Sequence, residues 1–206
     1  GVAFYLSIAL RKHLRDKGYW RRHTELNLKN LCDLVALGTV ADLVPLAHEN
    51  RVLVKTGLEV LQAQNRVGIK SLVKACGFFK HTVDSEDIAF RLAPRLNAAG
   101  RLEHAKTAAK LLLSDSEEQA AELAKFLDDL NIRRRELEKT AFKEVVKCLE
   151  DDPACSKQKA VVLASPAWHQ GILGIVASRV TEKYHRPAIL IAENNGSGRG
   201  SCRSIP

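Results

Sequence analysis

The sequence is poor in several features that define whole classes of protein. It contains no methionine, only 5% of its 206 residues are aromatic, and its apolar runs, such as 161–164 and 188–192, are short. A membrane-spanning helix needs about 20 apolar residues in succession, and no basic-then-apolar leader opens the chain. We therefore expect a soluble protein.

Paired cysteines and familiar catalytic motifs are also missing. The five cysteines are far apart, odd in number and without a C-x-x-C pair, which argues against a disulfide framework and a zinc cluster. The chain has no G-K-[ST] phosphate loop, no nucleophile elbow and no metal-type histidine spacing. Covalent catalysis has no support, and a reducing cytoplasm is the expected location. The cysteines are Cys32, Cys76, Cys148, Cys155 and Cys202.

Basic residues are concentrated at the two ends of the chain. The net charge is +8, and residues 1–30 and 157–206 each hold seven basic and two acidic side chains, whereas the middle is slightly acidic. Such an uneven positive field suits a polyanionic partner, although composition alone is weak evidence. The start at Gly1, the lack of methionine and the end at Pro206 suggest an excised fragment.

Apolar spacing predicts a mainly helical first part. Helices are expected over 2–15, from Asn30 to Val40, over 49–64, 68–76 and 84–93, with Pro94 breaking the last one. Ser114 followed by Glu117 is typical of a capping box. A helix of about 35 residues, roughly 50 Å long, should then run to Asp152-Pro153 as a connector between domains.

The composition changes after Pro153. Residues 160–163 and 188–192 are short strand candidates, and a helix is expected between them over 172–184. A strand-helix-strand unit of this kind joins parallel strands. The overall fold class is therefore α/β.

Asp42 is the first candidate for chemistry. It ends the apolar run that contains Gly38 and Thr39, and a carboxylate held there among apolar neighbours could bind a hard divalent cation. The residues alone favour a simpler interpretation, in which Asp42 caps the following helix. Asp33 is expected to be a cap or a surface acid.

Two segments could bind phosphate. Arg95, Asn97 and Arg101 lie among small residues after Pro94, where an ordinary loop with paired arginines is an equal alternative. The basic glycine-rich loop 196–204 offers backbone N–H groups, hydroxyls and positive charge, with a flexible turn as the weaker alternative. Its candidate ligands are Arg199, Ser201, Arg203 and Ser204.

Trp168 and His169 stand between a predicted strand and a predicted helix. Tryptophan can stack on a base and histidine can bind phosphate. Burial under the strand end is the more common fate of such a tryptophan. We therefore expect Trp168 to be structural and leave the role of His169 open.

Four motifs, in order and at plausible spacing, closely resemble the RecJ family of bacterial single-strand-specific 5′ to 3′ exonucleases in the DHH phosphoesterase superfamily. They are Asp33-Leu-Val-Ala-Leu-Gly-Thr-Val-Ala-Asp42, Arg91-Leu-Ala-Pro-Arg-Leu-Asn-Ala-Ala-Gly-Arg101, Trp168-His-Gln-Gly-Ile-Leu-Gly-Ile-Val-Ala-Ser-Arg179 and Gly198-Arg-Gly-Ser-Cys-Arg-Ser204. The resemblance covers nearly the whole chain. It implies the end of a DHH domain over 1–113, a connecting helix over 114–152, and the start of a DHH-associated domain over 153–206.

The resemblance also implies a mechanism and its residues. The intact enzyme would hydrolyse phosphodiesters of single-stranded DNA with two Mn²⁺ or Mg²⁺ ions, in DNA recombination and repair. Asp42 matches the family's Gly-x-x-x-Asp ligand motif, and the Asp-His-His signature and other ligand motifs are absent. Ser201 and Arg203 would grip the 5′-terminal phosphate with help from Arg101.

Partners and alternatives follow from the same resemblance. The resemblance implies single-strand-binding protein and a RecQ-type helicase as partners. It does not imply binding to a membrane. One alternative is a nuclease-inactive relative that serves a replication complex. The other is a short-oligonucleotide phosphodiesterase of the same superfamily, although the Trp168-His-Gln-Gly171 pattern differs from that enzyme's glycine-histidine motif.

Overall fold

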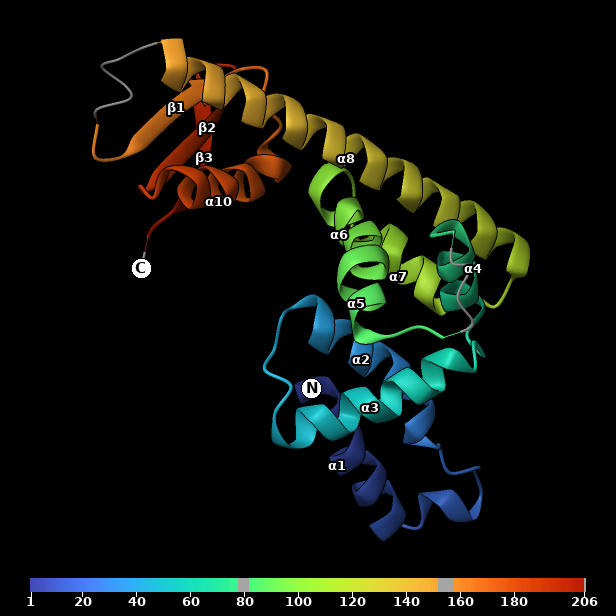
Figure 1. The fold of residues 1–206 in the computed structure, drawn as a ribbon. Coiled ribbons are helices and arrows are strands. Elements are labelled where there is room, and N and C mark those ends of the chain that lie inside the picture. Colours follow the sequence, from blue (N-terminus) through green and yellow to red (C-terminus); the bar gives the residue numbers. More distant parts are fainter. Residues whose placement is uncertain (78–81, 152–157, 206) are drawn as a thin grey trace. The chain divides into compact units, whose positions relative to one another are not determined.

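The protein is mostly helical, with a small mixed sheet near its C-terminus (Figure 1). The computed structural model describes residues 1–77, 82–151 and 158–205. The helices are α1 (Val2–Asp16), α2 (Cys32–Ala41), α3 (His48–Gln62), α4 (Val67–Ala75), α5 (Ser85–Asp87), α6 (Ala93–Leu102), α7 (Lys106–Leu113), α8 (Glu117–Asp151) and α10 (Leu173–Tyr184). The strands are β1 (Val161–Ser165), β2 (Ala188–Asn194) and β3 (Ser197–Arg203). Short 3₁₀ turns are η1 (Tyr19–Arg21), η2 (Leu28–Leu31) and η4 (Gln170–Ile172), and η3 (Ile88–Leu92) is a π-helix.

The chain divides into two compact units. Unit 1 comprises residues 1–96 and 108–125, and unit 2 comprises residues 97–107 and 126–206. The predicted boundary at 152 and 153 falls on residues outside the described ranges, so the domain limits remain a prediction. No helix in the described ranges is long and apolar enough to cross a membrane.

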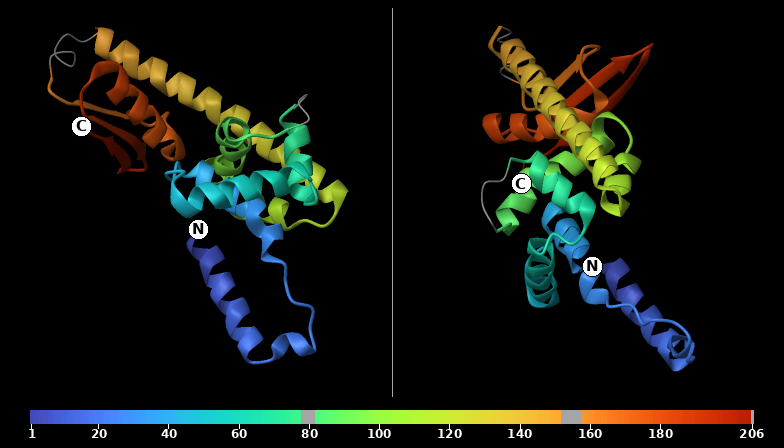
Figure 2. Two further views of the ribbon diagram at one scale, coloured as in Figure 1. Left: turned by 60° about the horizontal axis from the view of Figure 1, so that its bottom comes forward. Right: turned by 90° about the vertical axis from the view of Figure 1, so that its right-hand side faces the viewer.

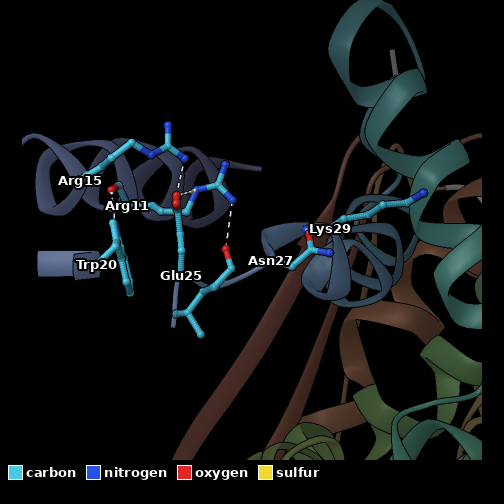
Figure 3. A network of polar contacts seen from close by, with 7 residues as sticks. Arg11, Arg15, Trp20, Glu25, Asn27 and Lys29 are labelled. Carbon is cyan, nitrogen blue, oxygen red and sulfur yellow. Dashed lines mark hydrogen bonds and ion pairs between the residues drawn. The ribbon is translucent and has the colours of Figure 1, made fainter. Parts of the chain in front are cut away.

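In unit 1 the chain after α1 runs back alongside that helix (Figure 2). A network of polar contacts holds this connection to α1 (Figure 3). The helix ends before Gly18, whose positive φ of 72° suits glycine. Arg15 pairs with Glu25, Arg11 donates to the Leu26 carbonyl at 3.0 Å, and the Trp20 indole N–H donates to the Arg11 carbonyl at 3.1 Å. The connection between α1 and η2 is therefore anchored to α1 by polar groups.

Close backbone approach holds the helices of unit 1 together. A Cβ atom on Gly57 of α3 would lie 2.2 Å from the carbonyl oxygen of Cys32 in α2. A Cβ on Gly68 of α4 would lie 1.9 Å from the carbonyl oxygen of Leu111 in α7. Neither site has room for a side chain, because backbone oxygens cannot move aside as a flexible side chain can. These glycines explain why α2 packs on α3 and α4 on α7.

The sequence predicted that Pro94 breaks the helix, and that prediction is wrong. Helical structure continues from α5 through η3 into α6, and Pro94 is the second residue of α6. Proline lacks an N–H and its ring crowds the preceding turn. The π-helix of η3 directly before it widens that turn, which accommodates the ring without ending the helix.

The long helix predicted after Ser114 is confirmed as α8, which has 35 residues. Its start differs from the prediction. The Gln119 backbone N–H donates to the Ser116 hydroxyl at 3.3 Å, so Ser116 caps the helix instead of Ser114. The Ser114 hydroxyl donates to the Ser116 carbonyl at 3.1 Å and stabilises the preceding turn.

Unit 2 contains the predicted strand-helix-strand unit. Strands β1 and β2 pair in parallel and α10 connects them, while β3 pairs antiparallel with β2 to give the order β1-β2-β3. One apolar core joins Val145 and Leu149 of α8, Val176 and Val180 of α10, and Leu190 of β2. Both helices therefore cover the same face of the sheet.

The glycine-rich segment predicted as a loop is instead strand β3. Its residues pair with β2 from Asn194 opposite Ser197 to Ala188 opposite Arg203. The turn between the strands has positive φ at Asn195 (46°) and Gly196 (77°), typical of a tight hairpin. Glycine and serine are weak strand formers, so long-range pairing with the apolar strand β2 decides this conformation.

Candidate nucleic-acid interface

The register of β3 brings three of the predicted phosphate ligands to one face of the sheet. Arg199, Ser201 and Arg203 lie opposite Ala192, Leu190 and Ala188 of β2, respectively. Residues directly opposite each other in an antiparallel pair share a face. These three β2 residues are buried in the core under α10. The ligands are therefore on the face of the edge strand that α10 borders.

Arg203 is held by three protein oxygens. Its Nε–H donates to the Ser178 hydroxyl oxygen at 3.1 Å, and Nη1 donates to the Cys202 carbonyl at 2.7 Å and the Ser201 hydroxyl at 3.4 Å. Arg203 is nevertheless an exposed residue. A hydroxyl beside an oriented guanidinium is suited to a phosphate group, which accepts charge-assisted hydrogen bonds. We refer to Ser201 and Arg203 as the Ser201–Arg203 pair.

The first turn of α10 adjoins the Ser201–Arg203 pair. A Cβ atom on Gly174 would lie 2.9 Å from Arg203 Nη2 and 3.2 Å from Ser201 Oγ. Backbone N–H groups in the first turn of a helix have no partner within the helix and attract anions. Positive charge, a hydroxyl and a helix start therefore meet at one surface of unit 2.

His169 and Arg199 line a hollow of about 690 Å³ in unit 2. His169 Nδ1 accepts the Gly171 backbone N–H at 3.1 Å and caps η4, which leaves Nε2 to carry the proton of a neutral ring. Arg199 Nη1 donates to the Gln170 side-chain oxygen at 2.8 Å. The hollow thus presents hydrogen-bond donors suited to an anionic or polar ligand.

Trp168 is structural, as predicted. Only 7% of its surface is exposed, and its indole N–H donates to Glu144 of α8 at 2.6 Å. A buried indole needs such a partner for its N–H. The bond joins the end of the β1 segment to α8.

Arg101 lies in a crowded polar environment within unit 2. Its Nη1 is 3.5 Å from the Gly171 carbonyl, and its buried Nε lacks a hydrogen-bond partner among the described residues. On α8, Arg134 Nε lies 3.2 Å from Glu138 Oε1. Burial lowers the pKa of Arg134, Glu138 opposes that shift, and the charge of Arg101 adds to it. The charge of Arg135 lowers the pKa of Arg134 as well, so positive charge exceeds negative charge around this guanidinium.

The segment from Arg95 to Arg101 is part of α6 and not a loop. Arg95 donates to the Arg91 carbonyl one turn earlier at 2.9 Å, and Asn97 is exposed. Arg95 and Arg101 are six positions apart in α6. They therefore do not lie on the same face of the helix, whereas residues three or four positions apart would. Arg95 belongs to unit 1, whereas Asn97 and Arg101 belong to unit 2.

Asp42 is exposed directly after the last residue of α2. It does not cap the next helix, because Ala47 is the N-cap of α3. Its neighbour Leu43 is 84% exposed. The expectation that apolar neighbours hold the Asp42 carboxylate in place is therefore wrong. Carboxylate oxygens suit Mg²⁺ and Mn²⁺, but one ligand does not make a site. The described ranges contain no group of three or more His, Cys, Asp or Glu residues placed to hold a metal.

Asp33 is neither a cap nor a surface acid, which corrects the prediction. Only 3% of the residue is exposed, and Oδ2 lies 2.8 Å from Arg66 Nε. Its Oδ1 accepts the Leu34 backbone N–H at 2.7 Å. A buried carboxylate requires such partners. Asp33 therefore connects α2 to the residue that precedes α4.

The structure brings together some predicted residues and separates others. The Ser201 hydroxyl accepts a hydrogen bond from Arg203, and His169 and Arg199 line the same hollow. Ser204 donates to the Ile205 carbonyl at 2.9 Å and lines another hollow, of about 350 Å³, with Thr181 and His185. Arg203 also lines that hollow.

Comparison with known proteins shows which proteins the chain resembles. Residues 157–206 match the model of the DHHA1 domain. Over its full length, the chain is 43% identical to the single-stranded-DNA-specific exonuclease RecJ of Haemophilus influenzae and 43% identical to that of Escherichia coli. The whole chain is thus similar in sequence to RecJ exonucleases. It covers 36% and 37% of those two relatives, so it spans little more than a third of their length.

Solved RecJ structures share this fold. A crystal structure of RecJ from Thermus thermophilus in complex with Mg²⁺ superposes with a TM-score of 0.76 at 39% identity, covering 90% of this chain and 28% of that one. A RecJ structure bound to manganese gives the same TM-score and identity, covering 91% of this chain and 46% of that one. The predicted resemblance to RecJ and the predicted fold class are therefore confirmed, and the solved RecJ structures hold Mg²⁺ and manganese, which are the predicted metals.

Sequence reasoning missed several residues at this candidate interface. Gly174 and Ser178 contact the Ser201–Arg203 pair, and Gly171 packs so tightly that a Cβ there would lie 1.9 Å from the Arg101 carbonyl oxygen. One signal was present, because a glycine inside a helical pattern costs about 1 kcal/mol relative to alanine and so marks an unusual position. The partners of these residues are far away in sequence and could not be read from that pattern.

Proposed function

We propose that this chain is part of a RecJ-type exonuclease that hydrolyses single-stranded DNA from its 5′ end. The proposal rests mainly on the similarity of this whole chain to single-stranded-DNA-specific exonucleases, together with an arrangement of side chains at β3 that suits a phosphate group. In this proposal the chain carries one metal ligand and the group that holds the substrate end. The rest of the catalytic centre comes from parts of the protein outside this chain.

The Ser201–Arg203 pair binds the terminal phosphate. Arg203 supplies positive charge and N–H donors, and the Ser201 hydroxyl supplies a further donor once it turns toward the ligand. Arg101 adds charge from α6, while His169, Arg199 and Ser204 contact the nucleotides that follow. Contacts to phosphate position the strand without reading its sequence, which suits an enzyme that degrades any single strand from its end.

Asp42 contributes one oxygen ligand to the metal centre of the intact protein. Mn²⁺ or Mg²⁺ held there, with Asp42 as one ligand, would supply Lewis-acid chemistry for phosphodiester hydrolysis. The exposed position of Asp42 leaves its carboxylate accessible to groups outside this chain. We further propose action in recombination and repair in the cytoplasm, with single-strand-binding protein and a RecQ-type helicase as partners.

Arg203→Ala in the full-length protein is expected to damage the use of 5′-phosphorylated DNA selectively. A lost charge-assisted hydrogen bond costs about 1.5 to 3 kcal/mol, or roughly 10- to 150-fold in rate. Single-turnover rates on oligonucleotides with 5′-phosphate and 5′-hydroxyl ends measure that selectivity. Arg51→Ala, which removes an exposed arginine of α3 in unit 1, is the matched control and should leave the ratio of rates unchanged.

A purely electrostatic role of Arg203 predicts a different pattern. Both substrates would then lose activity equally, and the salt dependence of binding would fall by about one counterion. Equal losses on the two end chemistries would contradict end recognition by the Ser201–Arg203 pair.

A further inference from the structure

A short relay of hydrogen bonds leads from α10 to Arg203. The Ser178 hydroxyl donates its proton to the Gly174 carbonyl at 3.0 Å, one helical turn earlier. A hydroxyl has a single proton but two lone pairs. Since the proton is committed to Gly174, the oxygen faces Arg203 as an acceptor, and it receives the Arg203 Nε–H at 3.1 Å.

This relay decides which edge of the guanidinium remains available. Nε and Nη1 point to oxygens of Ser178, Cys202 and Ser201. Among the described residues, these bonds leave the two N–H groups of Nη2 for a ligand. Nη2 is also the atom nearest to Gly174, 2.9 Å from where a Cβ would lie.

The orientation of Arg203 requires that position 174 has no side chain, whereas the fold does not. A Cβ there would meet the ends of two flexible side chains, Arg203 and Ser201, and no backbone atom within 4 Å is among its three nearest neighbours. Those ends can move by a few tenths of an ångström at little cost in stability. Alanine at position 174 would therefore displace the two proposed phosphate donors while α10 stays folded.

We propose that Gly174 and Ser178 are positioning residues that orient Arg203, and with it the Ser201–Arg203 pair, toward a terminal phosphate. This inference rests on the proposed function. Ser178 fixes the rotation of the guanidinium, and Gly174 keeps the space in which Nη2 and the Ser201 hydroxyl meet the ligand. Positioning of donors to within a fraction of an ångström is what a specific binding site requires.

The test measures single-turnover rates of the full-length protein on 5′-phosphate and 5′-hydroxyl single strands. Ser178→Ala should lower the ratio of the two rates about 3- to 10-fold, the effect of one misplaced hydrogen bond. Gly174→Ala should lower it about 10-fold or more, because two donors move. Ser178→Thr keeps the hydroxyl and should restore most of the ratio.

The matched control is Ser7→Ala on α1. The Ser7 hydroxyl makes the same bond to the carbonyl four residues earlier, at 2.9 Å from Ala3. This change should leave both rates unchanged. Thermal unfolding of every variant separates a loss of orientation from a loss of fold, and Ser178→Ala decides the outcome should Gly174→Ala be destabilised.

The outcomes distinguish this inference from the function on which it rests. If Arg203→Ala loses the preference for 5′-phosphate but Ser178→Ala and Gly174→Ala keep it, the positioning role is wrong and the proposed function stands. Equal losses on both substrates in the α10 variants would also overturn the positioning role. If wild type shows no preference, or Arg203→Ala retains it, end recognition and positioning both fail.

Discussion

Asp42→Ala in the full-length protein is expected to abolish degradation of single-stranded DNA and leave the fold intact. Loss of groups that merely support a metal ligand already costs 10- to 100-fold, so loss of a ligand should cost at least about 100-fold. Asp42 is exposed at the end of α2, and truncating an exposed side chain usually changes stability by less than about 0.5 kcal/mol. Nuclease assays with Mn²⁺ and with Mg²⁺, together with circular dichroism, measure the two effects.

Asp16→Ala is the control for this change. Asp16 is another exposed aspartate at the end of a helix, α1, and its loss should not affect turnover. Asp42→Asn should behave like the alanine variant, because a neutral amide is a poorer ligand for a divalent cation. Wild-type turnover by Asp42→Ala would show that the carboxylate only follows the end of α2 and holds no metal.

Arg66→Ala is expected to destabilise unit 1 by about 3 kcal/mol. It would leave the carboxylate of Asp33 buried without its charged partner, and breaking a buried ion pair from one side costs about 3 to 5 kcal/mol. The lower end applies because the Arg66 side chain is 22% exposed. Hydrogen exchange of the α2 amides, followed by mass spectrometry, measures the loss within unit 1.

A double variant tests the cause of this destabilisation. Asp33→Leu combined with Arg66→Met removes both charges and keeps similar volumes, so it should recover most of the lost stability. A change below about 0.5 kcal/mol in Arg66→Ala would mean that water already solvates Asp33. It would contradict the burial described for this pair.

Local patterns in the sequence were sufficient for part of this fold. The apolar spacing from Ala120 to Leu149 predicted α8 because helical periodicity is a property of neighbouring residues. Short apolar runs on either side of a helical pattern predicted the strand-helix-strand unit. The burial of Trp168 was predicted from its position beside β1. Family resemblance supplied the remaining expectations, including the metal ions.

Features that depend on distant partners could not be predicted from local pattern. Asp33 is buried because Arg66, 33 residues later, reaches it. Segment 197–203 is a strand because β2 is available to pair with it. Helix η3 accommodates Pro94 through a change of helical pitch that proline statistics do not reveal. The role of Gly174 required the position of Arg203, which comes from another element.

The most direct test compares the 206-residue chain with the full-length protein on one 5′-phosphorylated single-stranded oligonucleotide. The central claim is that this chain carries one metal ligand and the holder of the DNA end, but not a complete two-metal centre. We expect the full-length protein to release nucleotides in the presence of Mn²⁺ or Mg²⁺, and the 206-residue chain alone to release none. Metal-dependent release by the chain alone that Asp42→Ala abolishes, or no release by the full-length protein, would contradict the account.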